Sequence, residues 1–218
     1  MGLPGGNLLI DTSPDLRTQL LRERIGIVHS VLYTHGHADH VFGLDDLRLQ
    51  QFYLGHAVPL YCEKVVEDRI RRSFDYAFAD PKTAHEGAIP QLEMHRISTA
   101  PFGVLGCEIV PVRLEHGPRF ETLGFRVGNV AYCTDASAIP DQSWSRLEGL
   151  EVLILDALRH RPHPTHFSID EAVAVAERVG ARRTLFTHIN HELDHHETNA
   201  SLPAGVELAY DGLRIDLV

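Results

Sequence analysis

Short apolar runs of strand-like composition alternate with helically spaced stretches along most of the chain. The strand-like runs cover residues 7–11, 27–33, 59–62, 93–97, 104–114, 122–127, 130–133, 152–156, 183–187, 206–210 and 213–217. The helical stretches cover residues 14–23, 40–54, 63–74, 168–179 and 195–200. This alternation favours a layered α/β fold over a β-sandwich.

Local signals add detail to this pattern. Ser13 is the expected N-cap of the helix over 14–23, and Ser168 with Glu171 has the spacing of a capping box. Residues 75–92 show no clear period and predict a long surface excursion, with room for a short helix, of the kind that often borders a site.

Composition is that of an ordinary globular protein. The 218 residues are 44% hydrophobic and 23% charged, and no linker or low-complexity segment interrupts them, so a single domain over residues 1–218 is expected. No apolar run approaches the roughly 18 residues of a membrane span, and the first residues lack the pattern of a secretory signal. We therefore expect a soluble, cytoplasmic protein. Cys62, Cys107 and Cys133 stand singly in apolar contexts and are expected to be core residues rather than a disulfide framework.

The formal net charge of −10 disfavours nucleic acid as a partner, because binding to it needs Lys and Arg against phosphates. It leaves room for a small anionic substrate, since two bound metal ions would bring about four positive charges to the site.

Histidine placement is the strongest chemical signal. Three imidazoles and a carboxylate occupy residues 35–40, directly after an apolar run. Imidazole and carboxylate suit Zn²⁺ and its first-row neighbours, and a site with several His ligands and an open position is how proteins make metal-bound hydroxide at neutral pH. Further His and Asp candidates also follow predicted strands, at the edge where open α/β sheets place their sites. Together with the four residues of the 35–40 segment, the full set of candidates is His35, His37, Asp39, His40, His116, Asp135 and His188.

The segment His35–His40 and the distant His, Asp and His resemble the motif of the metallo-β-lactamase superfamily. The resemblance implies a four-layer αββα sandwich and two divalent metal ions, Zn or Mn. By it, the first metal would be held by His35, His37 and His116. The second would be held by Asp39, His40 and His188, with Asp135 bridging both. Asp39 would also orient the nucleophile, and Asp11 resembles the superfamily's strand-end aspartate that orients a histidine ligand, although a turn or capping role is equally open.

Within the superfamily, the sequence HGHADHVFGLDDLR resembles the phosphoribosyl cyclic phosphodiesterases and, more distantly, the tRNA 3′-processing endonucleases. His166 matches in position the His-x-Ser/Thr element that supplies their catalytic histidine. The resemblance implies hydrolysis of a small phosphodiester, cyclic ones included, with Asp39 and His166 as catalytic residues and His166 as general acid. Ser168 is expected to cap a helix, while His160, His163, Arg159 and Arg161 are expected to be solvated.

Two departures from those relatives stand out. The Cys-x-Cys-x-x-Cys cluster of a structural zinc site is missing, although His191 occupies the place of its histidine. The chain also begins near the family's second strand, which puts the first N-terminal strand in question.

Alternative functions remain open at this point. The same site could hydrolyse a carboxylic ester, thioester or lactone, in which case His166 would be dispensable. A carrier similar to the pyrroloquinoline quinone accessory member of the superfamily is the non-enzymatic alternative. A homodimer is left open.

Overall fold

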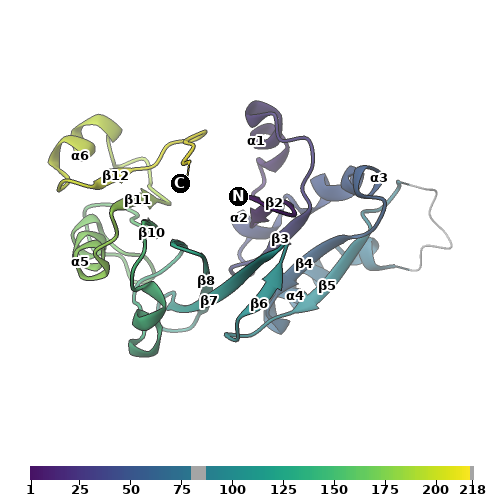
Figure 1. Cartoon of the computed structure of the whole chain (residues 1–218), viewed down its shortest axis with the longest axis horizontal. Helices are drawn as coiled ribbons and strands as arrows, with labels where there is room; N and C mark the ends of the chain where they lie inside the picture. Colours follow the sequence, from purple (N-terminus) through teal and green to yellow (C-terminus); the bar gives the residue numbers. More distant parts are fainter. Residues whose placement is uncertain (80–86, 217–218) are drawn as a thin grey trace. The chain divides into compact units, whose positions relative to one another are not determined.

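A computed structural model of the chain describes residues 1–79 and 87–216 (Figure 1). It divides into two compact units, Met1–Glu108 and Ile109–Val218, which are described in turn. The middle of the predicted surface excursion, residues 80–86, lies outside the described residues. The assignment of residues 1–218 to one domain stays a prediction.

The first unit is built on a sheet with the strand order β1-β2-β3-β4-β5. Its strands are β1 (Gly2–Leu3), β2 (Gly6–Ile10), β3 (Ser30–Leu32), β4 (Val58–Cys62) and β5 (Leu92–Arg96). β1 runs antiparallel to β2, and the other neighbours are parallel. The short β1 precedes the first strand predicted from sequence. Because β2, β3 and β4 are parallel, their carboxyl ends meet at one edge of the sheet.

Helical segments cover an apolar face of this sheet. They are α1 (Leu16–Glu23), α2 (Ala38–Val41), the 3₁₀ helix η1 (Leu44–Leu49), α3 (Gln50–Leu54), α4 (Lys64–Ser73) and the 3₁₀ helix η2 (Asp75–Phe78). Leu16 of α1, Leu47 of η1 and Ile70 of α4 are fully or almost fully buried, in one cluster with Val31 and Leu60 of the sheet. The helical spacing that the sequence shows thus packs the helices onto the strands.

Two predictions in this unit are wrong. The stretch over 40–54 is three short segments rather than one helix, because its backbone bonds to the segment before α1: the His40 carbonyl accepts from the Thr12 N–H at 2.7 Å, and the Gly43 N–H donates to the Thr12 carbonyl at 2.9 Å. Ser13 does not cap α1, whose N-cap position is Asp15. The Ser13 hydroxyl instead donates to Gln19 Oε1 at 3.0 Å.

The second sheet has the order β12-β11-β10-β9-β8-β7-β6. Its strands are β6 (Phe102–Val104), β7 (Cys107–Glu115), β8 (Glu121–Val127), β9 (Val130–Cys133), β10 (Val152–Asp156), β11 (Arg183–Thr187) and β12 (Val206–Leu208). β7, β8 and β9 form an antiparallel meander, while β9 to β12 are parallel. The boundary between the units falls inside β7. The run predicted over 104–114 is broken after β6, because Leu105 and Gly106 both have positive φ and make a turn.

Both faces of the second unit's sheet are covered. The 3₁₀ helix η4 (Asp141–Leu147), which sequence analysis missed, and α5 (Ile169–Val179) contribute to one core cluster, and Figure 1 shows α5 beside β10 and β11. α6 (His195–Ser201) follows β11. Leu213 and Ile215 pack on the other face, against Val152 and Leu185, without forming the strand predicted there, and residue 217 lies outside the described residues.

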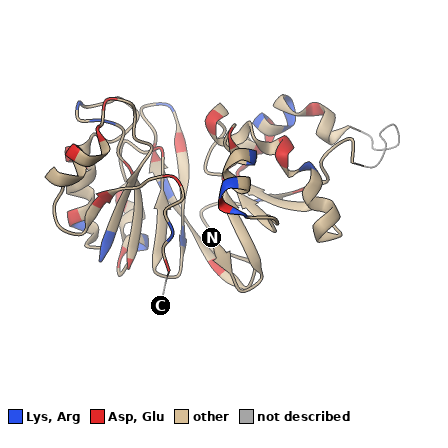
Figure 2. Ribbon diagram, turned by 90° about the horizontal axis from the view of Figure 1, so that it is seen from above, with Lys and Arg blue, Asp and Glu red and all other residues tan. Residues whose placement is uncertain are grey.

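Charged residues of both signs are dispersed over each unit (Figure 2). Among the helices in the described residues, none has both the length and the apolar character needed to cross a membrane.

The capping box at α5 yields a stability prediction. Ser168 Oγ accepts from the Glu171 backbone N–H at 3.4 Å, and Glu171 Oε2 accepts from the Ser168 N–H at 2.8 Å. Ser168→Ala should lower the free energy of unfolding by about 1 kcal/mol, because backbone donors at the helix start lose their partner. Denaturant unfolding tests this, with Ser145→Ala on the exposed side of η4 as control. Equal stability of the two variants would contradict it.

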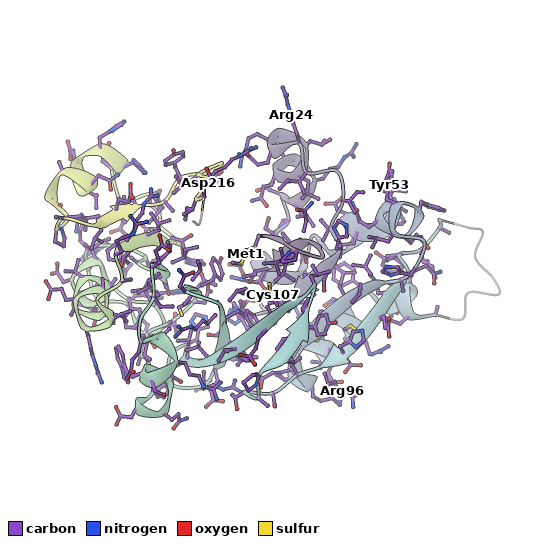
Figure 3. The ribbon with its side chains drawn as sticks, in the orientation of Figure 1. Met1, Arg24, Tyr53, Arg96, Cys107 and Asp216 are labelled. Carbon is purple, nitrogen blue, oxygen red and sulfur yellow. The ribbon has the colours of Figure 1, made fainter. Side chains whose placement is uncertain are left out.

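A second prediction concerns the buried Glu67 of α4, whose side chain is only 4% exposed. It accepts from Arg71 Nε at 2.8 Å and from Arg96 Nε of β5, which Figure 3 labels. The Arg96 hydrogen bond, opposed by burial and supported by Arg71, lowers the pKa of Glu67 below its ordinary value of 4.5. Its ionised form therefore stabilises the fold above about pH 4.5, and this stabilisation is lost as pH falls through the lowered pKa.

Glu67→Gln should cost about 1 kcal/mol at pH 7 and should flatten the loss of stability in acid. Thermal unfolding between pH 7 and pH 3 measures both effects. Asp68→Asn is the control, because the Asp68 carboxylate lies in an exposed ion pair with Lys64. An unchanged acid profile in Glu67→Gln would show that this carboxylate is not a source of the pH dependence.

Candidate metal centre

The predicted ligands of the first unit lie in the segment that follows β3. His35 Nε2 and His37 Nδ1 are 2.9 Å apart, and the ring centroids of His35 and His40 are 4.2 Å apart. Asp39 and His40 lie in α2, where Asp39 Oδ2 is 3.4 Å from His40 Nε2. The Asp39 side chain is 59% exposed, whereas His35 and His40 are buried. The unit thus gathers three imidazoles and one accessible carboxylate.

Asp11, the residue after β2, forms hydrogen bonds with this segment. Its carboxylate accepts from Thr34 N–H, from the Thr34 hydroxyl and from His40 Nδ1, each at 2.8 Å. Since the Thr34 hydroxyl donates to Asp11, it is free to accept from His35 Nδ1 at 3.0 Å. Asp11 therefore orients His40 directly and His35 through Thr34, leaving the Nε2 atom of each ring as a lone-pair donor. The hydrogen bonds that the predicted orienting role of Asp11 requires are present. Burial raises its pKa, while the His40 hydrogen bond opposes that shift.

The second unit brings together His116, Asp135 and His188. Asp135 Oδ2 lies 3.8 Å from His116 Nε2, and Asp135 Oδ1 lies 3.4 Å from His188 Nε2. The carboxylate thus offers one oxygen to each side. His116 Nδ1 donates to the Thr165 carbonyl at 2.7 Å, so its Nε2 faces Asp135 as a lone pair. Both Asp135 oxygens therefore face imidazole nitrogens that could hold a metal ion.

Three site residues have a left-handed backbone. Asp11, Asp135 and His188 have φ values of 59°, 53° and 60°. Such conformations cost non-glycine residues energy and cluster at functional sites, where the surrounding structure enforces them. Each of the three lies at or just beyond the carboxyl end of a parallel strand, so the turn redirects the side chain at the sheet edge.

His166 lies between two predicted ligands of the same unit. Its ring centroid is 4.7 Å from that of His116 and 4.7 Å from that of His188, with which it stacks at 14°. His166 Nδ1 donates to Asp156 Oδ2 at 2.8 Å, and the same oxygen accepts from the Ala136 N–H at 2.7 Å. The position fits a histidine that exchanges a proton through Nε2.

Asp156 is the functional residue that sequence analysis missed. The sequence pattern indicates only the last residue of an apolar strand, yet Asp156 is fully buried and its pKa is raised by burial, against the His166 hydrogen bond. The available signal was a carboxylate at the end of an otherwise apolar strand, as in Asp11. Ligand atoms of Asp156, His166 and His188 lie within 4.8 Å of one another.

The other sequence candidates have varied surroundings. Arg161 pairs with Glu192 Oε1 at 3.0 Å, and Arg159 donates to backbone carbonyls of its own loop. His160 and His191 are exposed, as expected for His160. His163 is half-buried beside His166 rather than solvated, and that prediction is wrong.

The three cysteines are free. Cys62 and Cys133 are buried as expected, and burial raises the pKa of each thiol to about 12. Cys107 is only half-buried, which corrects its assignment to the core.

The donor set of each unit fits a divalent metal. Neutral imidazole nitrogen and carboxylate oxygen are ligands for Zn²⁺ and Mn²⁺. His40 and His116 have Nδ1 committed to a fixed acceptor, which is the usual way in which a metal-binding histidine is oriented.

Comparison with known proteins places the chain. Residues 6–189 match the model of the Beta-lactamase superfamily domain. The chain belongs to the beta-lactamase superfamily. Its mixed α/β fold with two sheets is the metallo-β-lactamase fold, and the chain is a hydrolase-family member of that fold with His and Asp clusters suited to metal ions. The family and fold predicted from sequence are confirmed.

Two solved structures are similar to this chain over almost its whole length. A diphosphatase from the PhnP family is 46% identical, with a TM-score of 0.88 over 97% of this chain and 80% of that one. Human tRNase Z, short form, is 19% identical with a TM-score of 0.70 over 96% of this chain and 87% of that one, which shows the shared fold alone.

Curated relatives carry different names. An octanoyltransferase of Porphyromonas gingivalis (strain ATCC BAA-308 / W83) is 35% identical over 96% of this chain, which spans only 42% of that protein. Coenzyme PQQ synthesis protein B of Xanthomonas campestris pv. campestris (strain B100) is 28% identical over 96% of this chain and 83% of that protein.

The geometry around Asp11 generates a prediction about metal affinity. Asp11→Asn keeps the shape of the side chain but removes the charge that orients His40 and, through Thr34, His35. The affinity for Zn²⁺ should fall about 10- to 100-fold, measured by competition with a chromophoric chelator. Asp15→Asn, at an exposed position that makes no side-chain cap, is the matched control. Equal affinity in both variants would contradict the orienting role.

Proposed function

We propose that the chain is a metal-dependent phosphoric diester hydrolase that acts on a small phosphodiester. The observation that carries this proposal is the Asp156–His166 pair, held between His116 and His188 by a 2.8 Å hydrogen bond and ring contacts. Phosphodiester cleavage releases a poor leaving group, and a positioned histidine that can protonate it suits this need.

The ligand assignment belongs to the same proposal. Two divalent ions, Zn or Mn, would bind the seven His and Asp residues predicted from sequence: His35, His37 and His116 for the first, Asp39, His40 and His188 for the second, and Asp135 for both. The distances between candidate ligand atoms within each unit support these two ligand sets, and Asp135 has one oxygen near His116 and the other near His188. Such ions supply Lewis acidity and activate water.

The protein side chains would then divide the proton transfers. Asp39, with its accessible carboxylate, orients the attacking water and accepts its proton. As the water oxygen bonds to phosphorus, the bond from phosphorus to the leaving oxygen breaks. His166 gives its Nε2 proton to that oxygen, while Asp156 stabilises the imidazolium form of His166 before transfer.

The comparisons support this class of substrate. The 46%-identical solved structure is a diphosphatase of the PhnP family, and a diphosphate diester offers the same kind of phosphorus centre. The net charge of −10 favours a small molecule over nucleic acid. Cytoplasmic location and a homodimer stay predictions.

Two other functions have an observation in their favour. The name of the Porphyromonas gingivalis relative favours acyl chemistry on a carboxylic ester, thioester or lactone, although the match spans 42% of that protein. The similarity to coenzyme PQQ synthesis protein B favours a carrier role.

One comparison of variants separates these functions. Metal-reconstituted protein should hydrolyse bis-p-nitrophenyl phosphate and a 2′,3′-cyclic nucleotide in preference to a lactone and a thioester. His166→Ala should lower kcat on the cyclic nucleotide by about 10²- to 10⁴-fold, and less on the aryl ester, because p-nitrophenolate leaves without a proton.

Metal content and the His160→Ala variant are the controls for this experiment, since His160 is an exposed histidine of the same loop. Turnover of the lactone or thioester that is indifferent to His166→Ala would favour the acyl hydrolase. Fully metallated protein without any turnover would favour the carrier.

A further inference from the structure

The loop between β10 and α5 is closed by hydrogen bonds at its ends and within it. Its ends are joined by Leu158 N–H donating to the Phe167 carbonyl and Ile169 N–H donating to the Arg159 carbonyl, both at 2.9 Å. Arg159 then donates from Nε to the Arg161 carbonyl at 3.2 Å and from Nη2 to the Pro162 carbonyl at 3.1 Å. The guanidinium thereby links backbone groups of the loop.

His163 has a fixed backbone and a fixed tautomer. It stands between Pro162 and Pro164, which restrict the chain on both sides. Its Nδ1 accepts from the Thr165 backbone N–H at 3.3 Å and lies 3.2 Å from the Thr165 hydroxyl. Because a backbone N–H only donates, the neutral ring carries its proton on Nε2. Within residues 1–79 and 87–216, no hydrogen bond engages that Nε2–H.

The charge state of His163 agrees with this tautomer. Partial burial lowers its pKa, and the nearby positive charges of His166 and Arg159 act in the same direction. The ring is therefore a neutral donor at neutral pH.

The donor lies beside the proposed general acid. The ring centroids of His163 and His166 are 5.2 Å apart, with the planes at 41°. Thr165, which fixes His163 through its N–H, also accepts from His116 through its carbonyl. The segment 163–166 therefore positions the proposed ligand His116, the proposed acid His166 and the separate N–H donor His163.

We propose that His163 is a substrate-binding residue whose Nε2–H donates to a non-bridging oxygen of a leaving phosphoryl group, which makes diphosphate diesters the preferred substrates. This inference rests on the proposed function and on the role of His166 in it. His166 fixes where the leaving oxygen lies. A phosphoryl leaving group presents non-bridging oxygens next to the leaving oxygen for a donor one ring away, whereas p-nitrophenolate presents none in its leaving group.

The reaction balances without a further reagent. Water oxygen bonds to the attacked phosphorus, and the bond from that phosphorus to the bridging oxygen breaks. The bridging oxygen departs with the second phosphoryl group and takes its proton from His166. His163 keeps its proton throughout and supplies only a hydrogen bond.

The test compares two substrates and three variants. His163→Ala should lower kcat/KM about 10-fold on P1,P2-di(adenosine-5′) diphosphate, the typical effect of one hydrogen bond, and should change bis-p-nitrophenyl phosphate turnover by less than about 2-fold. His163→Gln, whose amide places a donor near the Nε2 position, should restore most of the loss. His160→Ala should match the wild type on both substrates.

A binding measurement separates this inference from the proposed function. Methylene diphosphonate, which cannot be hydrolysed, should bind metal-loaded wild type about 10-fold more tightly than His163→Ala in calorimetry. If nothing is turned over but this difference persists, the proposed function fails and the binding role stands. If both substrates are hydrolysed and His163→Ala changes them equally or not at all, the inference is overturned. Equal loss accompanied by lost metal would assign His163 a structural role through Thr165.

Discussion

A buried carboxylate at the end of a parallel strand, hydrogen-bonded to an imidazole, is the interaction on which each unit's part of the site depends. In the first unit Asp11 accepts from His40, and in the second Asp156 accepts from His166, both at 2.8 Å. Burial raises the pKa of each carboxyl group, so the charged form persists only with its donors in place. The same hydrogen bonds decide which ring nitrogen of each histidine faces the chemistry.

This dependence links the fold to the site. Parallel strands deliver Asp11, Asp135 and His188 to sheet edges, and each residue then turns with positive φ. Such a backbone is unfavourable in isolation, and the apolar clusters beneath each sheet hold it in place. In the loop that carries His166, one residue orients two histidines: the Thr165 carbonyl accepts from His116 and the Thr165 N–H donates to His163. Changes in the packing around these strands are therefore expected to affect metal affinity as well as stability.

Much of the fold could be predicted from periodicity. The strands β9, β10 and β11 and the helix α5 with its Ser168 cap lie where the sequence places them, because apolar runs of this length and a capping box are local signals. The predictions that are wrong depend on tertiary contacts. The backbone hydrogen bonds of His40 and Gly43 with Thr12 interrupt the helical stretch over 40–54, and the segment at Leu213 covers the sheet without joining it. Neither contact leaves a trace in the local pattern.

For the site, the sequence by itself determined the chemistry: the dense His and Asp motif names a metal-binding hydrolase fold, and the family match agrees. Only the tertiary structure decided the orientation of these groups. It identified Asp156 as the partner of His166, showed Asp11 bonded to His40, and moved His163 from solvent to the side of the proposed acid. The spacing of the candidate ligands can be seen in the sequence. A hydrogen-bond partner 10 or 29 residues away depends instead on how the strands pair and how the loops close.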